Sequence, residues 1–121
     1  MLPIEKQNLL SLFADRRRWC QQAEARNETG EAVRYDDPSA VAWDITGGMC
    51  MLFGWHRALE LFAQLDRHVH NVKRDHGWGD NPGIASMVAM QDRNDEDGTT
   101  CETIIEWLET MPVWNGHRQH L

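Results

Sequence analysis

The sequence predicts an all-α protein, a single compact orthogonal bundle of about five helices. Apolar residues recur at spacings of three and four along most of the chain, as on the buried face of a helix. No segment alternates like a half-buried strand, and residues 32–35 are the only short strand candidate. The 121 residues suffice for one domain, residues 1–121, and no linker divides them. We expect its core over about residues 4–112 and a polar tail over residues 113–121.

The first two helices are expected in the first half of the chain. An apolar stripe that includes Leu9 and Leu12 predicts the first helix over about residues 4–26. Asp37, followed by proline, matches the N-cap and first position of a second helix over residues 39–53. This second helix is apolar on nearly all sides, which is typical of a buried central helix.

Three further helices are expected in the second half. Residues 55–74 carry the most regular apolar stripe in the chain. Asn81, followed by proline, repeats the N-cap signature and predicts a short fourth helix. Thr99 and Glu102 have the spacing of a capping box for the fifth helix, which Pro112 ends.

The charge distribution disfavours direct binding to nucleic acid. The chain has 19 acidic against 12 basic side chains and a net charge of −7. Residues 36–121 hold 14 of the acidic and only six of the basic groups. An acidic surface repels the phosphate backbone, so no direct nucleic-acid binding is expected. The one exception left open is the basic run Arg16-Arg17-Arg18, which is more typical of a solvated helix face. No membrane association is expected either, because no stretch approaches the ~20 apolar residues of a span. The early charges of Glu5 and Lys6 count against a signal peptide.

The residues that could bind a metal lack the spacing that a metal site requires. His68 and His70 lie two residues apart, so on a helix they point to opposite sides. Residues 92–98 resemble a calcium loop, but the pattern places Arg93 at the first ligand position and Ile104 at the twelfth. We therefore predict no metal site and no cofactor.

The three cysteines do not indicate catalysis. Cys20, Cys50 and Cys101 form no CxxC pair and fall on apolar faces, where burial raises a thiol pKa and makes the thiol inert. No nucleophile or phosphate-binding motif is present, so no catalytic residue is predicted. An odd number of cysteines without a disulfide framework favours the reducing cytoplasm.

Asp44 is the one formal charge within the predicted second helix. A carboxylate in an apolar helix must be paired, exposed through a gap or shifted toward its neutral form. Two interpretations remain open. Asp44 either pairs with an arginine of the first helix or is a ligand-facing acid in a pocket between helices.

The chain has six tryptophans, an unusually large share of its aromatic residues. Three lie on or beside apolar stripes and are expected in the core: Trp19, Trp43 and Trp107. Three lie at a helix start, in a loop and in the tail, where the pattern does not imply burial: Trp55, Trp78 and Trp114. Tryptophan is common at binding hot spots, so each of these three is either packed or part of an interface.

Three short motifs resemble those of an uncharacterised family of small helical proteins from bacteria and their phages. They are Trp19-Cys20, the A-x-x-W-x-x-x-G pattern over residues 40–47, and Asn94-Asp95. Two positions depart from the family pattern. Asp44 stands where the family has cysteine, and Arg93 stands where it has an aromatic residue.

This resemblance covers about residues 9–111. It implies a helical fold and a phage or mobile-element setting, but it supplies no activity and no catalytic residue. The tryptophan and Asn-Asp positions of the motifs are interpreted as packing and turn features.

The leading functional hypothesis is a non-enzymatic acidic module that binds another protein. An inhibitor or regulator of a basic, nucleic-acid-associated protein, encoded by a phage or mobile element, fits this hypothesis. The alternative is a small-molecule or metal-dependent activity in an interhelical pocket around Asp44, and a third possibility is a homodimer. The candidate partner-binding residues are Trp55, Trp78, Trp114, Asp95 and Asp97.

Overall fold

The computed structural model describes residues 1–72 and 81–114. These residues form five α-helices, one short 3-10 helix and a small antiparallel sheet. In chain order the elements are α1 (Pro3–Phe13), η1 (Arg16–Arg18), β1 (Ala25–Arg26), β2 (Ala32–Val33), β3 (Ala42–Trp43), α2 (Ile45–Phe53), α3 (Trp55–His70), α4 (Pro82–Asp95) and α5 (Cys101–Thr110). The predicted all-α class is confirmed, because helices dominate and each strand has only two residues.

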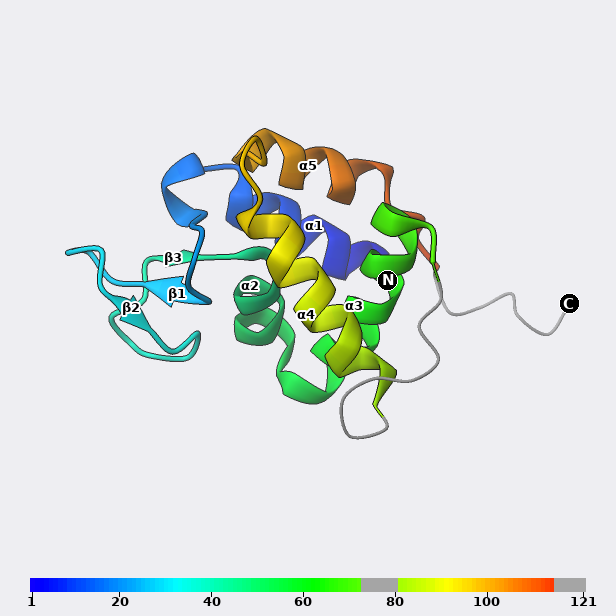
Figure 1. Cartoon of the computed structure of the whole chain (residues 1–121), viewed down its shortest axis with the longest axis horizontal. Coiled ribbons are helices and arrows are strands. Elements are labelled where there is room, and N and C mark those ends of the chain that lie inside the picture. The colour runs from blue at the N-terminus through cyan, green and yellow to red at the C-terminus, as the bar shows by residue number, and fades with distance from the viewer. Residues whose placement is uncertain (73–80, 115–121) are drawn as a thin grey trace, which may run out of the picture.

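Helix α2 lies at the centre of the helical part and contacts α1, α3 and α4. Helix α5 packs on α1, and α3 packs on α4 (Figure 1). The sheet, in the order β2-β1-β3, lies at one end of the molecule, away from α3. In the described part of the chain no helix has the length and apolar character needed to cross a bilayer. The largest fully buried apolar side chains are Phe13, Phe62, Leu9, Ile45, Met49, Leu61, Leu65, Met90, Ile104 and Leu108.

Helices α3, α4 and α5 begin close to where the sequence pattern places them, but two of them end elsewhere. Helix α3 ends at His70 and not at residue 74, because Asn71 adopts the left-handed conformation, and α4 continues to Asp95, into the segment that resembles a calcium loop. The side chain of Asn81 accepts a hydrogen bond from the Gly83 N–H (2.8 Å), so the predicted start of α4 is confirmed. The cap of α5 was placed one residue too early. Thr100, not Thr99, is the N-cap, and its hydroxyl and that of Thr103 bond each other's backbone N–H groups. Thr99 is buried instead.

The first helix is much shorter than predicted, because α1 ends at Phe13. The side chain of Asp15 accepts a hydrogen bond from the Arg17 N–H (3.0 Å), and this local bond caps η1 in place of a continued helix. Residues further along are drawn into the sheet, where Ala25 pairs with both Val33 and Trp43. The apolar stripe of the first helix therefore does not extend beyond Phe13.

The second helix begins at Ile45, six residues later than predicted. Asp37 does not cap it; its side chain holds a tight turn by accepting hydrogen bonds from the N–H and the hydroxyl of Ser39. The chain then enters β3, which pairs with β1. Gly54, with φ of +82°, ends α2 and allows α3 to start at the next residue.

Candidate functional site

The three motifs of the family resemblance lie together in the folded protein. Trp19 and Trp43 form an isolated parallel bridge, and the Cys20 N–H donates to the Trp43 carbonyl (3.1 Å). The same segment contacts the end of α4, where Asn94 and Asp95 lie. Residues far apart in the sequence thus build one polar cluster between the sheet, α2 and α4.

Asn94 is the centre of this cluster and is fully buried. Its Oδ1 accepts hydrogen bonds from the Trp19 indole N–H (2.8 Å) and from the Ile45 N–H (3.1 Å). Its Nδ2 donates to the Cys20 carbonyl (3.1 Å) and to Asp95 Oδ1 (3.0 Å). Because one amide satisfies groups from three segments, Asn94 fixes the position of η1 and the following residues against α2 and α4.

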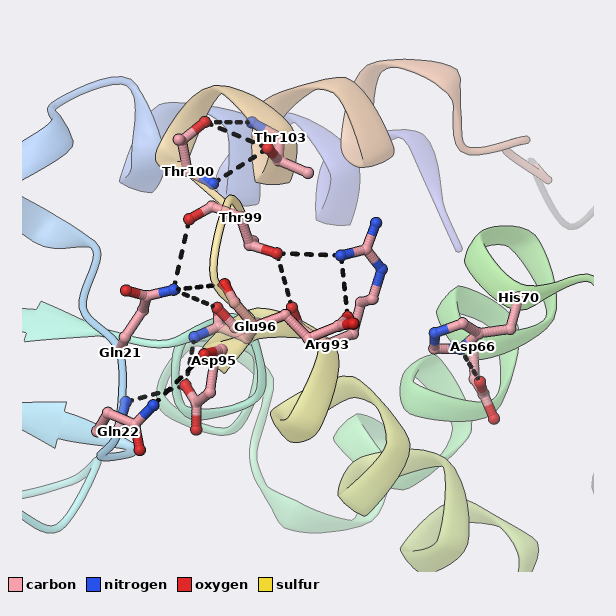
Figure 2. A network of polar contacts seen from close by, with 11 residues as sticks. Gln21, Gln22, Asp66, His70, Arg93, Asp95, Glu96, Thr99, Thr100 and Thr103 are labelled. Atoms are coloured by element: carbon pink, nitrogen blue, oxygen red, sulfur yellow. Dashed lines mark hydrogen bonds and ion pairs between the residues drawn. The ribbon is translucent and has the colours of Figure 1, made fainter.

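Gln21 and Gln22 extend the cluster over the end of α4 (Figure 2). The Gln21 amide nitrogen donates to the carbonyl of Asn94 (2.9 Å) and more weakly to that of Thr99 (3.4 Å). The Gln22 N–H donates to Asp95 Oδ1 (2.9 Å), and Gln22 adopts a positive φ of 67°. Asp95, a predicted partner-binding residue, is therefore occupied within the fold.

Asp44 caps α2 and pairs with no arginine of the described residues, those of the N-terminal segment included. It is 2% exposed, and its Oδ1 accepts hydrogen bonds from the Gly47 N–H and the Thr46 hydroxyl. Burial raises the pKa of Asp44 to about 7, and the carboxylates of Asp95 and Glu24 add to this effect. The structure thus contradicts the predicted arginine pair and places Asp44 at the helix N-cap, one residue before the helix.

Neither of two hollows on the surface supports the interpretation of Asp44 as a ligand-facing acid in a pocket. One hollow of about 430 Å³ lies between α3 and residues 111–112, and another of about 570 Å³ lies beside η1. Asp44 lines neither of them. Cys20 and Cys50 lie near Asp44, and burial raises the pKa of each thiol to about 12, so neither is a ready nucleophile.

Asp44→Asn is expected to change how stability depends on pH. Between the ordinary aspartate pKa of 3.8 and about 7, the unfolded chain has lost the Asp44 proton while the folded protein keeps it. This group's contribution to stability therefore falls as pH rises, by about 1.4 kcal/mol per pH unit. Asparagine keeps the capping oxygen but does not titrate.

The measurement is the free energy of unfolding of both proteins by urea. We expect the variant to gain about 2 kcal/mol relative to wild type between about pH 5 and about pH 7. Asp92→Asn, which removes an exposed carboxylate on α4, is the matched control and should change stability by no more than about 0.5 kcal/mol. A pH-independent difference for Asp44→Asn would show that the Asp44 carboxyl does not titrate in this range.

The remaining candidate residues lie at the surface or outside the described residues. Trp114 is 46% exposed and Trp55 38% exposed. The Trp55 ring contacts Phe62 edge-on, with centroids 6.5 Å apart, so part of it packs on the core. Asp97 is exposed in the loop before α5. Trp78 lies outside the described residues.

The other three tryptophans are partly or fully buried, as predicted. Trp107 is buried, and Trp19 and Trp43 are half-buried and pack against the core. The Trp43 indole N–H donates to the Tyr35 carbonyl (3.0 Å). The Trp107 ring belongs to the interior of the fold, and the Trp19 and Trp43 rings lie at its edge.

His68 and His70 each contact one polar side chain, and no group of side chains suited to bind a metal ion occurs in the part of the chain that the structure describes. His70 Nδ1 lies 2.6 Å from the buried carboxylate of Asp66, one helical turn away on α3 (Figure 2). His68 Nε2 lies 2.8 Å from the Thr110 hydroxyl on α5. The two histidines thus engage different partners.

The outer side of α5 is acidic. Glu102, Glu106 and Glu109 are exposed and follow a spacing of four and three, so they share one side of the helix. We call these three residues the α5 acidic face. Arg16 pairs with Glu102 (2.6 Å), whereas no ion pair engages Glu106 or Glu109 among residues 1–72 and 81–114. Within the described residues, Glu106 and Glu109 therefore present negative charge to solvent that no basic side chain pairs.

An apolar segment follows the α5 acidic face. Val113 and Trp114 are both about half exposed, and the Trp114 N–H donates to the Met1 carbonyl (2.9 Å). Lys6 holds the end of α5 by donating to the carbonyls of Glu109 and Met111. The backbone that carries the exposed ring is thus attached to the N-terminal residue at the end of α5.

Comparisons with models of protein families, with curated proteins and with solved structures gave no match to this chain. The candidate functional residues are therefore inferred from the geometry of this structure alone. Sequence reasoning placed Asn94 and Asp95 in a polar turn and did not find the central role of Asn94. The grouping of the Trp-Cys and Asn-Asp motifs in one resemblance was the signal that could have suggested their contact.

Proposed function

We propose that this protein is a non-enzymatic interaction module that binds a basic protein partner through α5 and the segment that follows it. The observation that carries the proposal is the exposed Trp114 ring directly beyond the α5 acidic face. A tryptophan anchor buries a large area with few rotatable bonds, which is typical of a binding hot spot.

The charge of the α5 acidic face supports a basic partner. Exposed carboxylates on the helix that precedes an apolar anchor accelerate encounter with a positively charged protein and disfavour acidic competitors. Nucleic-acid-binding proteins carry such basic surfaces. An inhibitor or regulator of such a protein, in the cytoplasm of a bacterium and in a phage or mobile-element setting, suits this surface and the family resemblance.

The proposal assigns the polar cluster around Asn94 a structural role. Its groups are paired with one another and Asn94 is fully buried, so the cluster offers no open position for a substrate. It holds η1 and the end of α4 together, and α5 begins six residues after α4 ends. The buried cluster around Asn94 thus holds the end of α4 in place, and this fixes the position of α5, although the cluster lies away from the binding surface.

Neutralising the α5 acidic face is expected to abolish capture of the partner. The test variant is Glu102→Gln/Glu106→Gln/Glu109→Gln, which keeps helix propensity and removes three charges. We expect wild type, immobilised in a native lysate, to retain a stoichiometric basic protein that this variant does not retain. The readout is mass spectrometry of the eluted proteins.

A matched variant controls for net charge. Glu28→Gln/Asp36→Asn/Glu60→Gln removes the same number of exposed charges from two loops and α3. It should retain the partner as wild type does. If both variants fail to retain the partner, net charge alone explains the result. If both variants retain it, the α5 acidic face has no role in binding.

A further inference from the structure

A groove between η1 and the sheet has the opposite charge to α5. It has a volume of about 570 Å³, within the range of small-molecule sites. Arg17, Arg18 and Arg26 line it, together with Trp19 and Val41. We call this hollow the arginine groove.

The three guanidinium groups differ in how they are compensated. Arg17 donates twice to the Asp15 carboxylate, at 3.0 and 2.8 Å, so its charge is neutralised in place. Arg26 donates only to backbone carbonyls, those of Gln21 and Gly30, which fix the guanidinium without neutralising it. The backbone N–H of Arg18 donates to the Asp15 carbonyl (2.9 Å), but its guanidinium makes no hydrogen bond or ion pair in the described part of the chain.

Two cationic groups in the arginine groove therefore keep their charge and free N–H donors. Three of the five N–H groups of Arg26 are used, which leaves two, and all five of Arg18 remain. Glu28 is the other acidic residue that lines the groove besides Asp15, and it is exposed. In a chain with a net charge of −7, this local excess of positive charge favours an anionic ligand.

The wall of the arginine groove also offers apolar surface. The Trp19 ring is half-buried, and its indole N–H is held by Asn94, so the ring is fixed in orientation. Val41 is 40% exposed although it adjoins β3. A flat apolar group can contact these side chains while an anionic group reaches the guanidinium groups.

We propose that the arginine groove binds a small aromatic anion. Its phosphate or carboxylate group contacts Arg18 and Arg26, and its ring lies against Trp19 and Val41. This site is separate from the α5 acidic face and would operate whether or not the protein partner is bound. Either anionic group satisfies the same donors, so the test includes both.

The test is an NMR titration with phenyl phosphate, read from the indole N–H signal of Trp19. Arg18→Ala is the test variant. Because the Arg18 guanidinium has no hydrogen-bond or ion-pair partner in the described fold and the backbone bond of Arg18 is kept, the substitution should leave the melting temperature unchanged. We expect saturable binding in the millimolar range for wild type, weakened about fivefold or more by the substitution.

Arg16→Ala is the matched control. Arg16 lies in the same η1 but pairs with Glu102 and does not line the groove, so the affinity should stay within about twofold.

Further probes separate the parts of the ligand. Benzoate replaces the phosphate by a carboxylate, and the tighter of the two probes identifies the preferred anionic group. Phenol lacks the charge and inorganic phosphate lacks the ring, so both should bind more weakly than phenyl phosphate. Equal affinities for these probes, an equal effect of the two arginine substitutions, or no binding up to about 10 mM of any probe would overturn the proposal.

Discussion

Asn94→Ala is expected to destabilise the folded protein by about 3–5 kcal/mol. The substitution removes a fully buried amide and leaves three groups without their partner: the buried Ile45 N–H and the partly buried Trp19 indole N–H and Cys20 carbonyl. Each unsatisfied buried group costs about 1–3 kcal/mol, and the lost volume adds to this. The measurement is the free energy of unfolding from urea denaturation, followed by tryptophan fluorescence.

Asn8→Ala is the control for this substitution. Asn8 is exposed on α1, so the same chemical change there should alter stability by less than about 0.5 kcal/mol. A cost below about 1 kcal/mol for Asn94→Ala would contradict the central role of Asn94. It would mean that water or a rearranged side chain satisfies the three groups equally well.

Gly47→Ala is expected to cost at least about 4 kcal/mol, or to prevent cooperative folding. A Cβ atom at position 47 would lie 2.0 Å from the carbonyl oxygen of Glu24. That oxygen accepts the Asp44 N–H (3.2 Å), so moving it disturbs both the β1–β3 pairing and the cap of α2. Thermal unfolding followed by circular dichroism measures the effect.

Gly48→Ala gives a graded comparison in the same helix. A Cβ atom there would meet the Phe13 ring at 2.8 Å, and a ring edge can give way more easily than a hydrogen-bonded backbone carbonyl. We expect Gly48→Ala to unfold cooperatively and to be the more stable of the two variants. The reverse order would show that the Glu24 segment is not fixed where the structure places it.

The helices that were predicted well are those whose start and apolar face are encoded locally. Asn81 followed by proline begins α4, and the regular stripe of α3 is buried as expected. Asp37 followed by proline carries the same local signal but starts only a turn. The difference lies in residues 42–43, which pair with β1, and a local pattern does not contain that long-range pairing.

The candidate site was predicted less well than the fold, for the same reason. Asn94 and Asp95 were interpreted as turn residues, but their side chains bond backbone groups of Cys20, Gln22 and Ile45, which lie 49 to 74 positions earlier. Asp44 was expected to need a partner, and the need was real. The partners are N–H and hydroxyl groups at the N-terminus of α2 and not an arginine, and burial raises the pKa of the carboxyl so that it is neutral more often.

The measurement that tests the proposed function most directly is the affinity of the purified partner for three proteins at low and high salt. These are wild type, the variant of the α5 acidic face and the matched charge variant. We predict that the first variant binds at least about tenfold more weakly at low salt, that the matched variant binds within about twofold of wild type, and that the difference shrinks as salt screens the charges. Equal affinities for the two variants would contradict the assignment of the interaction to α5.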